Sequence, residues 1–295
     1  MTTPERPPTS NSPLSNSPLS NGAIDLHTHT TASDGLLSPA DLVLEAGRRG
    51  IGVLGVTDHD TLDGLPDAAR AATRAHLTLV PGVELSTTIP GPEIHILGYF
   101  VNQDDAVFVG HLAALARDRV NRITNVVRLL NDAGYPIDMA AILAQADEGS
   151  IGRPHVARAL IELGAAADMN DAFSCFLKRG TVGWAPRSPF TAEEAVRMLL
   201  DNGAVPVLAH PFSTRDVEGT VKRLVLAGLR GLEVYYSEYD KAQQQELLRM
   251  AQRYGLAPTG GSDFHGPRFR EGRDLGTVSV PVAAWDHLQT LRPSR

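Results

Sequence analysis

The chain has 295 residues, of which 42% are hydrophobic and 21% charged, and its formal net charge is −7. This length is sufficient for one α/β barrel, with or without a smaller insert. The acidic balance disfavours a broad electrostatic grip on long nucleic acid, whereas a small phosphorylated substrate held by a few arginines is compatible with it. Cys175 is the single cysteine, which excludes an internal disulfide and a thiolate zinc site.

The sequence contains no apolar run of the ~20 residues that are needed to cross a bilayer, and the N-terminus lacks the apolar core of a signal peptide. We therefore expect a cytoplasmic protein without a membrane partner. Residues 1–22 are rich in Pro, Ser and Asn. Such a segment buries too little apolar surface to fold, so we expect a disordered tail.

Strand-like and helical patterns alternate from Ala23 onward. The apolar runs that are typical of buried strands span 23–29, 51–56, 77–85, 93–100, 204–210, 231–236 and 256–263. Between them, Ser38 and Pro39 predict the start of a helix that Gly50 ends, a second helix is expected over about 61–75, and Thr191 with Glu194 forms a predicted capping box. This alternation predicts a parallel, barrel-like sheet.

Residues 103–180 interrupt the alternation and contain no convincing strand. Apolar residues recur at helical spacing before Gly134, namely Leu112, Leu115, Ile123, Val126, Val127 and Leu130. Two shorter helices are expected near 153–163 and 168–179, and Cys175 is expected to be a small buried residue of the second. We therefore expect a helical insert (cap) domain over 103–180 between two barrel parts, 23–102 and 181–295.

Residues with metal-ligand side chains keep recurring at or near the ends of the predicted strands. They are His27, His29, Asp34, His59, Glu84, His95, His210, Asp263 and His265. A lone histidine on a strand is more often a hydrogen-bonded structural residue, and a lone aspartate after a strand is more often a helix cap. Nine such residues on one predicted barrel rim are better explained by bound cations, because unpaired burial of so many charges is costly.

Six imidazoles and three carboxylates could hold two or three divalent ions. The mixture suits Zn²⁺, Mn²⁺ or Fe²⁺, and the sequence does not choose among them. Closely spaced ions lower the pKa of water and clamp the oxygens of an in-line displacement at phosphorus, so phosphate-ester hydrolysis is favoured. Amide hydrolysis in barrel amidohydrolases uses similar ligands.

The motifs in their order along the chain resemble the polymerase and histidinol phosphatase (PHP) family. They are HTHTTASDG (27–35), TDHD (57–60), GVE (82–84), HILGY (95–99), AHP (209–211) and SDFH (262–265). The resemblance implies a distorted (β/α)7 barrel with a di- or trinuclear metal site.

The resemblance also implies how the ligands are shared among three metal positions. His27, His29, Glu84 and Asp263 would hold the first, Glu84, His95 and His210 the second, and Asp34, His59 and His265 the third. In our hypothesis a metal-bound hydroxide attacks phosphorus. The residues that hold it are His27, His29, Asp34, His59, Glu84, Asp263 and His265. Asp58, Asp60 and Asp25 would orient ligands through hydrogen bonds.

Within the family, the chain resembles 3′,5′-nucleoside bisphosphate phosphatases and 5′→3′ exoribonucleases that act on short RNA. GRPHVARAL (152–160) is similar to an insert segment that supplies an Arg and a His to substrate phosphate, which implicates Arg153 and His155. Arg119 and Arg122 are three apart and share a helix face, and arginine forks match phosphate geometry. We therefore predict that these four residues bind substrate phosphate.

Two other functions remain open at this point. Histidinol-phosphate phosphatase is the alternative within enzymes, although the paired arginines favour a nucleotide. The other is a non-catalytic metal-binding or polymerase-associated module. The sequence does not indicate the oligomeric state.

Overall fold

The computed structural model describes residues 22–87, 93–146, 151–186, 188–267, 269 and 272–293. The predicted disordered tail lies outside these ranges except for Gly22. Across the described helices, none combines the length and the apolar character that a membrane span needs.

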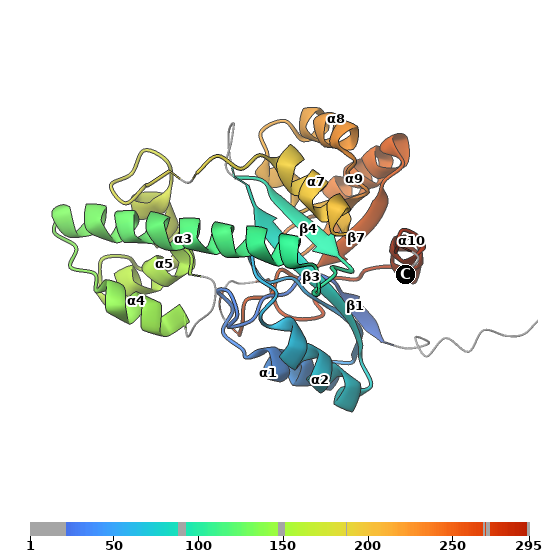
Figure 1. The fold of residues 1–295 in the computed structure, drawn as a ribbon, viewed down its shortest axis with the longest axis horizontal. Helices are drawn as coiled ribbons and strands as arrows, with labels where there is room; N and C mark the ends of the chain where they lie inside the picture. The colour runs from blue at the N-terminus through green and yellow to red at the C-terminus, as the bar shows by residue number, and fades with distance from the viewer. Residues whose placement is uncertain are drawn as a thin grey trace, which may run out of the picture.

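A seven-stranded sheet lies at the centre of the molecule, between two groups of helices (Figure 1). Its strands pair in chain order: β1 (Ala23–Asp25), β2 (Ile51–Val56), β3 (Thr78–Ser86), β4 (His95–Tyr99), β5 (Val205–Leu208), β6 (Gly231–Tyr236) and β7 (Ala257–Gly261). The sheet nearly closes, because the Leu26 N–H donates to Gly260 O at 3.1 Å and Thr28 pairs in parallel with Phe264. The predicted α/β barrel is confirmed.

The orientation of β4 differs from the all-parallel prediction. β4 runs antiparallel to both β3 and β5, whereas the other neighbouring strands are parallel. The connection over residues 87–94 is too short for the crossover that a parallel pair requires, so the chain must turn back. The reversal places His95, the first residue of β4, opposite Ser86, the last residue of β3. His95 thereby reaches the rim where the parallel strands end.

Within the described residues, six helices outside the stretch 103–180 pack around the sheet. They are α1 (Pro39–Arg48), α2 (Leu65–Ala75), α7 (Ala192–Asp201), α8 (Val217–Ala227), α9 (Lys241–Tyr254) and α10 (Val282–Thr290), with a short 3₁₀ turn η2 (Pro211–Ser213) after β5. Two predicted starts are confirmed: Ser38 Oγ accepts the Asp41 N–H at 3.1 Å, and Thr191 forms a capping box with Glu194.

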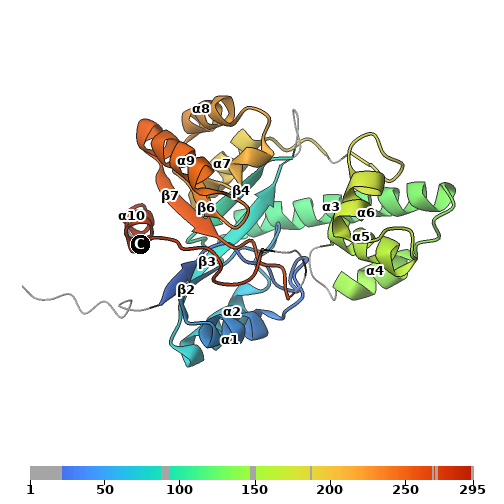
Figure 2. The same ribbon diagram turned by 180° about the vertical axis from the view of Figure 1, so that it is seen from behind.

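The chain between β4 and α7 forms a helical region, which we define as residues 106–177. It consists of α3 (Ala106–Asp132), α4 (Met139–Ala146), α5 (Arg153–Glu162), α6 (Met169–Ala172) and the π-helix η1 (Phe173–Leu177). Figure 2 shows α4, α5 and α6 gathered around the end of α3 that points away from the sheet. The shorter elements therefore depend on α3 for their position.

Helix α3 connects two hydrophobic cores. Phe108 and Leu112 near its start belong to the core that packs around the barrel. Ile123 and Leu130 belong to a second core, formed within the helical region and joined by Ala185. Arg119, which is 8% exposed, lies on α3 between these two apolar sets. The helix therefore carries a buried cation into the seam between the barrel and the helical region.

The sequence analysis missed one helix of the helical region and placed one residue wrongly. Helix α4 was not predicted, although Asp138 directly before it accepts the Ala140 N–H at 2.9 Å and so caps its start. Cys175 is exposed rather than buried, and its thiol donates to Asp171 Oδ1 at 3.2 Å. In η1 the inward positions are taken by Phe176 and Leu177, so the cysteine faces outward.

Candidate metal centre

The predicted ligands lie in the segments that the rim brings together. His27 and His29 follow β1, and the intervening Thr28 turns away to donate its hydroxyl to Gly55 O at 2.6 Å. A Cβ at Gly261 would collide with the backbone nitrogen of His27, so the glycine lets β7 approach this segment. Alternation along the extended backbone thus directs both imidazoles to the same side.

The remaining ligands follow the other strands at the same rim. His59 pairs with Glu84 of β3 in a parallel bridge, and His210 follows β5. His210 and Asp263 have positive φ angles of 26° and 54°. Non-glycine residues seldom adopt this conformation, so surrounding contacts must hold these two turns.

Glu84 lies at the centre of the cluster and is 1% exposed. Its Oε2 is 3.2 Å from His27 Nε2, 3.1 Å from His29 Nε2 and 3.3 Å from His59 Nδ1. Its other oxygen, Oε1, is 2.8 Å from His95 Nδ1 and 3.1 Å from His210 Nε2. The two oxygens thus face different imidazole groups, which is the arrangement that a bridging carboxylate requires.

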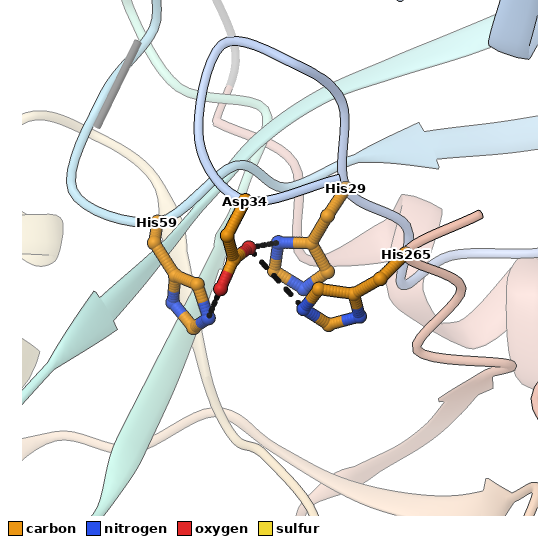
Figure 3. Close-up of side chains that lie close together, drawn as sticks. All are labelled: His29, Asp34, His59 and His265. Carbon is orange, nitrogen blue, oxygen red and sulfur yellow. Dashed lines mark ion pairs between the residues drawn. The ribbon is translucent and has the colours of Figure 1, made fainter. Parts of the chain in front are cut away.

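Asp34 forms a second focus of the cluster (Figure 3). Its Oδ1 is 3.3 Å from His265 Nε2 and 4.0 Å from His29 Nδ1, and its Oδ2 is 3.8 Å from His59 Nε2. The rings of His29 and His265 stack with their centroids 4.1 Å apart. Side chains from three separate strand ends therefore converge on one loop carboxylate.

Within the described residues, three groups place their potential ligand atoms within 4.8 Å of one another. They are His27, His29, Glu84 and Asp263; His29, Asp34, His59 and His265; and His59, Glu84 and His95. The first coincides with the set predicted for the first metal position. The second contains the set predicted for the third position and adds His29. His210 stands outside these groups but contacts the same Glu84 oxygen as His95.

The charges of the cluster balance one another in the interior. Although burial raises the pKa of Glu84, nearby imidazoles, with His59 first, hold it well below its usual value. Burial lowers the pKa of His29, yet Asp263 and Glu84 raise it to about 10. The carboxylates therefore remain ionised, and protons on the imidazoles oppose their charge.

His29 provides a test of whether cations fit this arrangement. Its side chain is fully buried, and neither ring nitrogen has a hydrogen-bond partner of acceptable geometry. An unsatisfied buried imidazole is costly, whereas coordination to a divalent ion uses such a nitrogen directly. Cations would also replace the protons that oppose the carboxylates. The donor set therefore fits divalent metal ions.

The carboxylates predicted to orient ligands act through the backbone and other side chains. Asp58 accepts from the Thr30 N–H and hydroxyl, both at 2.7 Å, and from Ser33, and so holds the loop that carries Asp34. Asp60 accepts from Arg119 Nε at 2.6 Å. Asp25 accepts the Ser262 N–H at 2.9 Å and thereby ties the end of β1 to the segment after β7. None of these five hydrogen bonds is to a ligand ring.

Three further residues support the cluster and were not predicted. Glu233 of β6 is fully buried, and its Oε1 lies 2.9 Å from His27 Nδ1 while Oε2 accepts the His210 N–H at 2.6 Å. Tyr236 donates its hydroxyl to Asp263 Oδ2 at 2.8 Å, and Arg273 bonds to the same oxygen. For Glu233, the signal in the sequence was a glutamate inside the apolar run GLEVYY. Nothing in the sequence singled out Arg273.

A cavity of about 560 Å³ opens beside the cluster. Its lining includes His59, Glu84 and Asp263 together with Arg122 of α3 and Arg153 at the start of α5. Arg119 also lines it, with its Nε bound to Asp60. His155 is not part of the cavity wall: it is 2% exposed, and its Nδ1 accepts the Gly152 N–H at 3.1 Å. The predicted contact of His155 with phosphate stays a prediction.

Known proteins are similar to this chain in both sequence and fold. The PHP domain matches residues 25–168. The chain is 37% identical to the 5′-3′ exoribonuclease Rnm of Salmonella typhimurium, over 82% of this chain and 85% of that protein. It is 32% identical to the 3′,5′-nucleoside bisphosphate phosphatase of Chromobacterium violaceum, over 92% and 99%. A crystal structure described as a metal-dependent phosphoesterase of Bifidobacterium adolescentis has a TM-score of 0.84 at 27% identity, covering 92% of this chain and 97% of that one.

The barrel and its buried cluster, together with these relatives, define a metal-dependent phosphoesterase, a hydrolase that acts on phosphoester bonds. The chain belongs to the PHP family.

Proposed function

We propose that the enzyme hydrolyses nucleotide phosphate esters at the 3′ position of a nucleotide whose 5′-phosphate is held at a distance from the reacting group. The substrates would be nucleoside 3′,5′-bisphosphates, short 5′-phosphorylated oligoribonucleotides, or both. The main support is structural: one cavity contains the His and carboxylate cluster together with Arg122 and Arg153. The named activities of the Salmonella and Chromobacterium relatives support this choice.

In this proposal the cluster holds two or three divalent ions. The ligand sets would be His27, His29, Glu84 and Asp263; Glu84, His95 and His210; and Asp34, His59 and His265. Such ions lower the pKa of water and neutralise charge on the phosphoryl oxygens. The residues around them fix the geometry: Glu233 orients His27, while Tyr236 and Arg273 fix Asp263.

The arginines of the cavity would bind the remote 5′-phosphate. Arg122 and Arg153 are 11% and 25% exposed, so their guanidinium groups can be reached from the cavity. The Arg119 side chain is 10% exposed, and its guanidinium is bound to Asp60 and Ser86, which favours a role in shaping the wall. A bidentate guanidinium recognises phosphate oxygens by both charge and geometry. Holding this phosphate would place the ribose 3′ oxygen, as the leaving group, at the cluster.

A substrate panel tests the proposal. Manganese-loaded protein would receive adenosine 3′,5′-bisphosphate, adenosine 3′-phosphate, histidinol phosphate and a 5′-phosphorylated trinucleotide, with phosphate release and products measured. We expect the first and last to be the best substrates and 5′-AMP to be the product of the first. A higher kcat/KM for histidinol phosphate, or equal values for the two adenosine substrates, would contradict the proposal. Release of 5′-nucleotides from the trinucleotide would add exoribonuclease activity.

A further inference from the structure

An acidic side chain lies within the proposed phosphate-binding wall. Glu93, directly before β4, lines the cavity and is 23% exposed. Its Oε1 is 3.5 Å from Arg122 Nη1, and its Oε2 accepts a hydrogen bond from Arg153 Nη2. Each carboxylate oxygen therefore faces a different guanidinium. Two oxygens of a bound phosphate would make the same pair of contacts.

The two arginines have other contacts that fix them without Glu93. Arg122 Nε donates to Ala185 O at 3.0 Å, and the Arg153 guanidinium lies over the Phe173 ring, 5.6 Å from its centroid. Removing the charge of Glu93 would therefore leave both guanidinium groups near their positions. Glu93 is then a counter-ion to the arginines more than a support for them.

A substrate phosphate and the Glu93 carboxylate cannot both pair with these guanidinium groups without strong repulsion. We propose that Glu93 is a specificity-determining residue: an internal anion that competes with the remote phosphate for Arg122 and Arg153. This inference rests on the proposed function. Glu93 weakens binding of the 5′-phosphate, and its return to the arginines after hydrolysis displaces a product that still carries that phosphate. Glu93 thus lowers the affinity for the 5′-phosphate and speeds release of the product.

The test measures binding of the product directly. Calorimetry on the manganese-loaded full chain would give the Kd of 5′-AMP and of adenosine for wild type, Glu93→Gln and Glu93→Ala. The control Glu246→Gln makes the same charge change at an exposed residue of α9 outside the cavity. We expect both Glu93 variants to bind 5′-AMP about tenfold more tightly, because a competing like charge is removed, with adenosine unaffected. KM for adenosine 3′-phosphate should not change, and product inhibition by 5′-AMP should increase.

The outcomes separate this proposal from the function on which it rests. Unchanged or weaker 5′-AMP binding in both Glu93 variants, with adenosine 3′,5′-bisphosphate still the preferred substrate of wild type, would overturn the role of Glu93 alone. Weaker binding would show that the carboxylate positions the arginines. If 5′-AMP and adenosine bound equally in every protein, and Arg153→Ala changed neither Kd, both proposals would fall.

Discussion

The two walls of the cavity are built in different ways. On the barrel wall, the side chains of Glu84 and Asp263 are at most 7% exposed; Glu84 lies within β3, and Asp263 lies in the positive-φ turn after β7. The other wall, which we call the helical wall, consists of Arg122 and Arg153 from the helices together with Glu93, directly before β4. These side chains are between 11% and 25% exposed and are joined to one another by ion pairs. The first wall has little freedom to rearrange, whereas the ion pairs of the second can be exchanged for a ligand.

The difference assigns different parts of the reaction to the two walls. Groups that act on a reacting phosphorus must be preorganised, because rearrangement during the reaction adds to the barrier. Groups that recognise a remote phosphate must release the product afterwards. We therefore expect changes in the barrel wall to reduce kcat and changes in the helical wall to alter KM.

Asp263→Asn should have the largest effect. The amide removes a charge opposite His27 and His29 while conserving shape, so we expect kcat to fall by at least about a thousandfold. Phosphate release with excess Mn²⁺ would measure this, and circular dichroism would show that the fold persists. Asp286→Asn, on the exposed side of α10, is the matched control. Near-normal turnover of metal-loaded Asp263→Asn would show that the barrel wall is not the reacting wall.

Glu233→Gln should have an intermediate effect. The variant weakens the acceptor at His27 Nδ1, so metal affinity should fall by about 10- to 100-fold while excess metal restores much of the turnover. Activity titrated with Mn²⁺, alongside metal content after gel filtration, would measure this. Glu246→Gln is the control. Unchanged metal affinity would limit Glu233 to its hydrogen bond with the His210 backbone.

The two walls also differ in how far their features follow from the sequence. Period-two alternation and the recurrence of His and Asp after apolar runs were enough to predict that His27, Glu84 and Asp263 lie at one rim. The reversed direction of β4 was missed, although a connection of eight residues, 87–94, already excludes a crossover. Local pattern therefore predicts which residues end strands better than it predicts how strands pair.

Contacts between distant segments were beyond prediction. Glu93 meets Arg153 across 60 positions and Arg273 meets Glu238 across 35, and no periodicity relates such pairs. Glu233 was predicted only as part of a strand. A single carboxylate in an apolar run does not reveal which distant residues it will contact. The barrel wall is thus more predictable, because strand geometry places its residues. The helical wall depends on how α3 and α5 pack.

Arg153→Ala should separate binding from catalysis. Loss of one guanidinium from the helical wall should raise KM for adenosine 3′,5′-bisphosphate by about tenfold or more, with kcat nearly unchanged. KM for adenosine 3′-phosphate should stay the same. The control is Arg249→Ala, at an exposed residue of α9. Steady-state kinetics on both substrates would measure this. An equal fall in kcat for both would place Arg153 with the reacting groups and remove the contrast between the walls.

His155→Ala should have the smallest effect on catalysis. Burial lowers the pKa of His155 to about 4, and its Nδ1 accepts the Gly152 N–H at the start of α5. We therefore expect a loss of about 1 kcal/mol in stability, as for other helix caps, and a KM for adenosine 3′,5′-bisphosphate within about twofold of wild type. Denaturant unfolding and steady-state kinetics would measure these values.

The pH dependence of stability distinguishes a cap from a phosphate ligand. A folded pKa below the unfolded value of about 6.5 means that the unfolded chain binds more protons between the two. The contribution of neutral His155 is therefore complete above pH 6.5 and is lost as the pH falls toward 4. The difference in unfolding free energy between wild type and His155→Ala should therefore become smaller as the pH falls from about 6.5 to about 4. A KM as high as that of Arg153→Ala would instead place His155 on the helical wall, in contact with the phosphate.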